Sequence, residues 1–222
     1  MIIAPYEGDF AAALATAARA KGWETACAKR SLPLDPTVST EREGARENRD
    51  LPWNPASYVS AAALALSAEA SPASVETLVL ICDAGSAGAS LFDGSPGGLA
   101  ASLEAGVSGP VYLCREMARR FDARSAGRIL LVSVEGPTGK GEGHAPGSTA
   151  FQTLVGAAFR GLGEGLFDRA KISAWSAWGL VDRSGKPEVA ADFALRLLDE
   201  QKTGKSGRWL PFNGKAGLFG VF

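Results

Sequence analysis

Two long apolar runs constrain the fold of this chain more than any other feature. TLVLICDAG (77–85) and GRILLVSVEG (127–136) show no alternation of polar and apolar residues, which is typical of strands buried on both faces. Between them, apolar residues recur at helical spacing over 99–121, from Leu99 through Val111 to Phe121. A buried strand, a crossover helix and a second buried strand predict a parallel sheet with helices on its faces.

The same alternation of strand and helix extends over the rest of the chain. Asp9 and Asn54 are the predicted N-caps of two helices, and the proline-containing, charged segment 31–52 is expected to be irregular. The order predicts one Rossmann-like, doubly wound α/β domain over residues 1–222, with a shortened N-terminal half. The further expected strands are 1–4, 23–30, 171–179 and 206–215, and the expected helices are 9–21, 53–70, 99–121, 148–168 and 187–201.

Composition excludes several classes of function. The net charge is −1, so nothing favours binding to nucleic acid or to an anionic membrane surface. The N-terminus lacks a basic stretch and a long apolar run, so we expect no signal peptide or transmembrane helix. Cys27, Cys82 and Cys114 form no CxxC pair and are expected to be buried thiols in a cytoplasmic protein. With His144 as the only histidine, no histidine-rich metal site is expected.

Five segments, taken in order, carry a resemblance to a known family. ICDAG (81–85) is similar to an NNAG turn, and GRILLVSVEG is similar to a strand that ends at a catalytic serine. Three further segments follow at matching intervals: AAFRGLGEGLF (157–167), KISAWSAWGLV (171–181) and SGRWLPFNGK (206–215). From about residue 77 to 215 the chain therefore resembles a short-chain dehydrogenase/reductase (SDR), whereas the first 76 residues match only loosely.

The resemblance implies a glycine-rich turn for the dinucleotide between the first strand and the first helix. Glycines there let the backbone approach the pyrophosphate at the helix N-terminus. Here the turn reads IAPYEGDF, with Ala4 and Phe10 in place of the first and third glycines and only Gly8 remaining. Glu7 and Asp9 add negative charge, so we expect this chain to bind no NAD(P). Lys29 and Arg30, where the family often holds a 2′-phosphate, are interpreted as a solvated strand end.

The family's catalytic pair, a Tyr followed four positions later by a Lys, is absent. The residues four positions after Tyr6, Tyr58 and Tyr112 are a Phe, an Ala and a Glu. General acid catalysis needs a titratable group near the substrate carbonyl. The positions that the resemblance assigns to the catalytic Asn, Ser, Tyr and Lys hold Gly106, Val134, Gln152 and Gly156. We therefore expect no catalytic residue and no metal.

A residual substrate cleft is a separate hypothesis. Its expected lining is Ser133, His144, Phe151 and Trp178, with His144 in the glycine-rich loop 137–147, which we expect to be flexible. The glycines of that loop fit neither GxxxxGK[ST] nor GxGxxG, so the loop is not a phosphate-binding motif.

The resemblance also implies an assembly. In the family, the helices that match 99–121 and 148–168 form a four-helix interface between subunits. Gly156, Gly161, Gly163 and Gly165 lie within the second helix, and interior glycines cost roughly 0.5–1 kcal/mol each, which favours close helix packing. The apolar tail 216–222 is expected to dock on a neighbouring subunit.

Three functions remain open from the sequence. The first is a non-catalytic subunit of a hetero-oligomer, expected to be a tetramer, in which an intact SDR chain holds NAD(P). The dehydrogenase for 2-[hydroxy(phenyl)methyl]succinyl-CoA has such an inactive subunit, and this chain resembles it. A second copy of this chain is the alternative partner. The second function is a divergent NAD(P)H-dependent carbonyl reductase or alcohol dehydrogenase. The third is a small-molecule sensor that uses the old substrate cleft.

Overall fold

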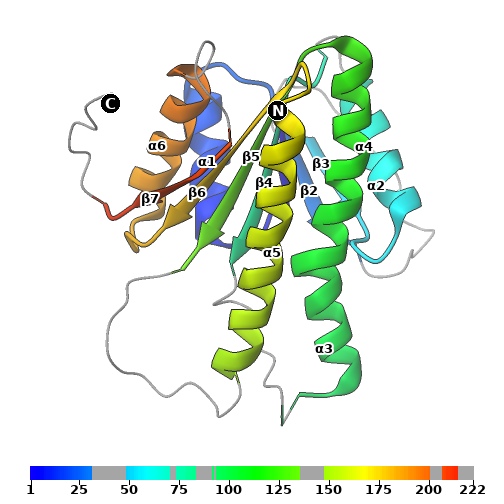
Figure 1. Cartoon of the computed structure of the whole chain (residues 1–222), viewed down its shortest axis with the longest axis vertical. Helices are drawn as coiled ribbons and strands as arrows, with labels where there is room; N and C mark the ends of the chain where they lie inside the picture. The colour runs from blue at the N-terminus through cyan, green and yellow to red at the C-terminus, as the bar shows by residue number, and fades with distance from the viewer. Residues whose placement is uncertain are drawn as a thin grey trace.

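A seven-stranded parallel sheet forms the centre of the molecule (Figure 1). The computed structural model describes residues 1–31, 49–70, 74–83, 92, 94–135, 148–200 and 207–214. The strand order is β3-β2-β1-β4-β5-β6-β7, and each neighbouring pair is parallel. The strands are β1 Ile2–Ala4, β2 Ala26–Arg30, β3 Arg49–Trp53, β4 Thr77–Asp83, β5 Arg128–Val134, β6 Ser176–Asp182 and β7 Trp209–Phe212. The predicted doubly wound α/β fold is confirmed.

Helices cover both faces of this sheet (Figure 1). One layer consists of α1 (Gly8–Ala20) and α6 (Pro187–Glu200), here called the α1–α6 layer. The other, the α2–α5 layer, contains α2 (Tyr58–Glu69), α4 (Gly109–Arg124) and α5 (Ser148–Ala170). The helix α3 (Pro96–Leu103) runs through a π-helical turn, η2 (Glu104–Ser108), into α4. Within the described residues, no helix is both long and apolar enough to cross a membrane.

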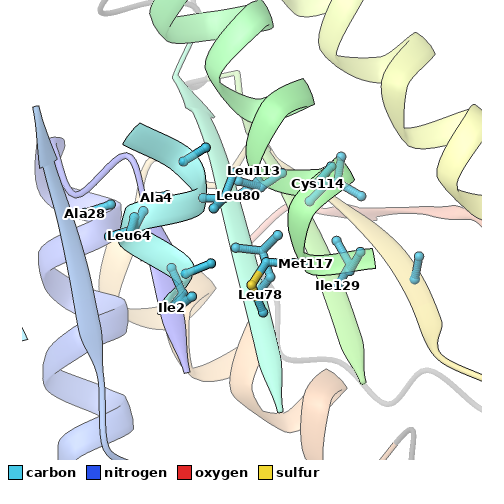
Figure 2. Packing of buried hydrophobic residues seen from close by; sticks show 14 of the residues in the cluster. Ile2, Ala4, Ala28, Leu64, Leu78, Leu80, Leu113, Cys114, Met117 and Ile129 are labelled. Carbon is cyan, nitrogen blue, oxygen red and sulfur yellow. The ribbon is translucent and has the colours of Figure 1, made fainter. Parts of the chain in front are cut away.

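Side chains of the central strands alternate between these two layers. In β4, Leu78 and Leu80 face the α2–α5 layer, whereas Val79 and Ile81 face the α1–α6 layer. Figure 2 shows Leu80 beside Leu113 and Leu78 beside Met117, both of α4. This two-residue period explains why a strand covered on both faces is apolar throughout.

The segment 31–52 was predicted to be irregular, and this is wrong for its last residues. Arg49–Trp53 form β3, which pairs with β2 alone and is an edge strand. Pro52 lies within β3, where an edge position tolerates a missing backbone N–H donor. The polar composition of β3 gave no strand signal in the sequence, because an edge strand needs no continuous apolar run.

Helix and strand starts also differ from the predictions. The N-cap of α1 is Glu7 rather than Asp9, and its side chain makes no capping hydrogen bond. The N-cap of α2 is Ser57, whose hydroxyl accepts from the Ser60 amide at 3.2 Å, whereas the Asn54 carboxamide accepts from Ala56 in the preceding turn. Strand β6 begins at Ser176 rather than at residue 171.

The predicted apolar stripe of the long helix is interrupted. Leu103 and Val111 belong to the predicted stripe but are 36% and 38% exposed. The π turn η2 lies between them, and its wider i→i+5 hydrogen bonding shifts which residues face the sheet. After η2, α4 buries Cys114, Met117 and Phe121 of the predicted stripe, together with Leu113. A sequence pattern that assumes a uniform helical period fails across such a turn.

Candidate functional site

The chain forms a cleft of about 200 Å³ at the carboxyl edge of the sheet, between the N-termini of α1 and α6. The strand order reverses beside β1, with β2 on one side and β4 on the other, and such switch points are where open α/β sheets bind ligands. We call this hollow the α1–α6 cleft. It is lined by Glu7, Gly8, Asp9, Phe10, Ile81, Asp83, Val134, Asp182, Gly185, Lys186 and Pro187.

Carboxylates dominate the α1–α6 cleft. Asp9 lies in the first turn of α1, and Asp83 and Asp182 are the last residues of β4 and β6. A Cβ built on Gly8 would lie 4.0 Å from Asp83 Oδ2, so this carboxylate is next to the N-terminus of α1. Lys186 is the basic side chain of the lining. A phosphate group placed here would meet several negative charges at short range.

The turn between β1 and α1, which the resemblance assigns to the cofactor loop, has buried side chains in place of two of the expected glycines. Phe10, at the expected third glycine, is buried in the core beneath α1, and Ala4 is fully buried. Gly8 has φ +78°, a conformation that favours glycine, so it serves the turn itself. The prediction that this chain binds no dinucleotide stays a prediction, and the geometry supplies its physical reason.

Basic residues at the end of β2 are paired with the chain's own carboxylates. Lys29 Nζ lies 2.5 Å from Asp50 Oδ2, and Arg30 Nε lies 3.2 Å from Glu7 Oε1. Arg30 and Glu7 also line a neighbouring hollow of about 180 Å³, together with Ser102 of α3. An incoming 2′-phosphate would have to displace Glu7 from Arg30.

The positions assigned to catalytic groups lie on different sides of the sheet. Ser133 is buried and follows Leu131 on the side of the α2–α5 layer, whereas Val134 faces the α1–α6 cleft. Gly106 lies in η2, and a Cβ built there would be 2.5 Å from Val155 Cγ1 of α5. Val155 therefore occupies the space that a larger side chain at position 106 would need.

Two further positions, Gln152 and Gly156, are half-buried on α5. Neither residue has a side chain that titrates near neutral pH. Within the described residues, no group of three His, Cys, Asp or Glu side chains could hold a metal ion.

The residues predicted to line an old substrate cleft do not come together. Phe151 is buried in the core on the side of the α2–α5 layer, and Trp178 is fully buried on the side of the α1–α6 layer. The sheet separates them, so the prediction that both line one cleft is wrong. His144, the loop 137–147 and the tail 216–222 lie outside the described residues.

Helix α5 carries glycines of two kinds. A Cβ on Gly163 would overlap the indole of Trp209 in β7, so this glycine is required by packing inside the chain. Gly161 and Gly165 have no heavy atom within 4 Å of a built Cβ. They lie one helical turn apart on the outward face of α5, near the exposed Leu154.

Asp182 and Lys186 were not singled out from the sequence. The available signal was that β6, like β4, ends in an acidic residue directly after a buried run. The three cysteines are buried free thiols, as predicted. Burial raises the pKa of Cys27 to about 11 and that of Cys82 to about 12, which makes both thiols poor nucleophiles at neutral pH.

Comparison with known proteins shows the fold and no closer relationship. No protein-family model matches the chain, and no curated protein matches it in sequence. A metagenomic short-chain oxidoreductase (SDR), solved in complex with NADP, superposes with a TM-score of 0.67 at 17% identity, over 95% of each chain. Ribose-5-phosphate isomerase from Brucella melitensis 16M superposes with a TM-score of 0.70 at 14% identity, over 96% of this chain and 90% of that one. The chain therefore has an SDR-like fold.

Proposed function

We propose that this chain is a non-catalytic subunit with an SDR-like fold that stabilises an active NAD(P)-dependent dehydrogenase or reductase. The partner would hold the cofactor and the catalytic Tyr and Lys. This chain would contribute the long helix α3–α4 and the helix α5 to the contact. The SDR-like fold supports this proposal, because the metagenomic oxidoreductase that shares it was solved in complex with NADP.

The outward glycines of α5 carry the proposal. Glycine inside a helix costs roughly 0.5–1 kcal/mol relative to Ala, and Gly161 and Gly165 have no neighbour within the described chain that would require it. Glycine is useful at such positions when another helix approaches closely. The exposed face that they share also carries Ala150, Leu154 and Ala157.

Loss of catalysis is supported by the carboxyl edge of the sheet. A carbonyl reductase needs an acid that delivers a proton and a site that accepts the dinucleotide phosphates. Gln152 and Gly156 supply neither acid nor ammonium group, and four acidic residues line the α1–α6 cleft. On both faces of the sheet the chain nevertheless buries a large apolar cluster, as expected for a chain that is selected for its fold.

Purification through a tag on this chain, from the cell that makes it, followed by native mass spectrometry, tests the proposal. We expect a complex with a second chain that contains the Tyr-x-x-x-Lys pair, with NAD(P) released only from that second chain. A homo-oligomer of this chain that carries NAD(H) or NADP(H) would refute the proposal and would favour a divergent reductase.

Substitutions on α5 test the surface. Gly161→Leu and Gly165→Leu are expected to abolish recovery of the partner while the circular dichroism spectrum stays that of the wild type. The matched control is Ala12→Leu, at an exposed position of α1 in the other layer, which is expected to retain the partner. Equal recovery with all three variants would show that α5 is not the contact surface.

A further inference from the structure

The outer face of α2 is apolar although it is open to water. Val59 and Leu66 are 75% and 64% exposed, and the exposed Ala63 lies between them at helical spacing. The inner face of the same helix buries Leu64 in the core, so α2 is apolar on both faces. A helix that is apolar all round is normally buried. Val59, Ala63 and Leu66, here called the α2 face, therefore form a candidate contact surface.

Arginines lie at both ends of the α2 face, and two of them have no carboxylate partner. Arg49 of β3 donates to the Ser67 carbonyl oxygen, in the C-terminal half of α2, at 2.7 Å. The Arg115 guanidinium of α4 lies 5.4 Å from the ring centroid of Tyr58, the first residue of α2. Among the described residues, neither guanidinium forms an ion pair with an acidic side chain. Both charges are therefore available to a partner.

The other charges of α2 and α4 add to this excess. Glu116 accepts from Arg119 and Arg120, and Glu69 pairs with Arg120 and Arg124, so three arginines share two glutamates. With the two unpaired arginines, five arginines lie against two glutamates. This surface therefore carries about three positive charges, on a chain whose net charge is −1.

These charges decide which kind of chain can cover the α2 face. A second copy that docked through the same face would bring two positive surfaces together, and like charges disfavour such a contact. Asp122, the remaining acidic residue of α4, is paired with Arg169 of α5 and offers such a copy no relief. A segment with apolar side chains flanked by Asp and Glu would cover the α2 face and also pair with Arg49 and Arg115.

We propose that the α2 face binds an acidic amphipathic helix of another protein. Val59, Ala63 and Leu66 recur at the spacing of one helical face, and the small Ala63 side chain lets a second helix approach closely. Arg49 and Arg115 pair with the carboxylates that flank the apolar stripe of this partner. Helix α2 packs against β3 and α4, away from the outward glycines of α5 (Figure 1), so the inference does not depend on the proposed role as a subunit.

Photo-cross-linking of the full chain, in the cell that makes it, tests this inference. Val59 or Leu66 is replaced by p-benzoylphenylalanine, and the cross-linked segment of the partner is identified by mass spectrometry. The matched control is the same replacement of Ala12, an exposed residue of α1. We expect products from positions 59 and 66 and none from position 12. The identified segment should carry apolar residues at helical spacing and a surplus of Asp and Glu.

A synthetic peptide with the sequence of the identified segment then measures the charge and apolar contributions by fluorescence anisotropy. Arg115→Glu is expected to weaken binding roughly tenfold, and Leu66→Gln a few-fold. The affinity of the wild type should fall as salt is added. Arg196→Glu makes the same charge change on the exposed surface of α6 and should leave binding unchanged. Arg115→Gln, expected to weaken binding a few-fold, serves if Arg115→Glu does not fold.

Three outcomes would overturn the inference. The first is that positions 59 and 66 give no more product than position 12. The second is that the cross-link joins this chain to itself, to a second copy, to lipid or to a segment without surplus carboxylates. The third is that Arg115→Glu and Leu66→Gln bind the peptide as tightly as the wild type does. Gly161→Leu is expected to retain the cross-link, which separates this contact from the proposed contact through α5.

Discussion

The helices of the two layers are held to one another by different interactions. In the α1–α6 layer, the ion pair between Lys21 and Asp199 is exposed, with 36% and 44% of the two side chains accessible. In the α2–α5 layer, Glu116 of α4 is buried and accepts hydrogen bonds from Tyr58, Arg119 and Arg120. Arg120 also pairs with Glu69 of α2. The buried network ties α2 to α4, whereas the α1–α6 contact depends on apolar packing.

The outer surfaces of the two layers differ as well. Six of the exposed large apolar or aromatic residues lie on the long helix and its neighbours, and one, Val189, lies on α6. The six are Tyr58, Val59, Leu66, Leu103, Val111 and Leu154. The outer surface of the α1–α6 layer thus exposes few large apolar side chains among the described residues. The α2–α5 layer is tied together by a buried network and exposes most of these apolar side chains, as expected of a surface that meets another chain.

Removal of the buried carboxylate should have the largest effect. Glu116→Ala removes one of the two carboxylates that pair with the partly buried Arg120 and frees the Tyr58 hydroxyl. We therefore expect a loss of about 3 kcal/mol in the free energy of unfolding. Urea denaturation measures it. A loss below about 1 kcal/mol would remove the distinction between the two layers.

Overpacking of α5 should come next. Gly163→Ala places a methyl group inside the indole of Trp209, and we expect a loss of about 2 kcal/mol. Gly165→Ala, two residues further along the same helix, meets open space and should instead gain up to about 1 kcal/mol from helix propensity. Thermal denaturation of both variants gives the comparison. If both changes destabilise alike, the outward glycines are required within the chain and not for a partner.

Acid should weaken the α2–α5 layer first. Burial alone would raise the pKa of Glu116, but hydrogen bonds from Arg119, Arg120 and Tyr58 outweigh it and hold the pKa below its ordinary 4.5. A lowered folded-state pKa contributes stability above the unfolded value, and this contribution is lost as pH falls through the folded value. The difference in unfolding free energy between wild type and Glu116→Gln should therefore shrink below about pH 4.5. A constant difference down to acid unfolding would contradict this.

The smallest effect is expected in the α1–α6 layer. Lys21→Ala breaks only the exposed pair with Asp199, so we expect a change of about 0.5 kcal/mol or less. Urea denaturation at low and high salt measures it, and the effect should vanish at high salt. A larger loss of unfolding free energy would mean that this exposed ion pair stabilises the α1–α6 contact substantially.

The sheet was predictable because its central strands are buried on both faces. β4 and β5 are continuous apolar runs, and only one fold class places several such runs between helices. β3 was not predictable, since an edge strand that contains Pro52 carries no apolar signal. Asn54 and Ser57 are both good N-cap residues three positions apart, and only the geometry of the turn decides for Ser57.

The site was predictable only in part, for a related reason. Substitutions such as Phe10 for a glycine can be seen in the sequence, and so can the carboxylates near it. Asp182 lies far from Asp9 along the chain, so only the parallel sheet brings both to one edge. The alternation in β6 could have separated Trp178 from Phe151, but β6 was predicted to begin too early to fix its faces.

The π turn η2 joins two parts of the long helix that differ in burial. α4 is anchored in the core, whereas α3 has no buried residue and projects beyond the carboxyl edge of the sheet (Figure 1). Ala105 and Gly106 of η2 line the hollow beside Arg30. A change in the geometry of η2 would therefore widen or narrow this hollow without moving a strand.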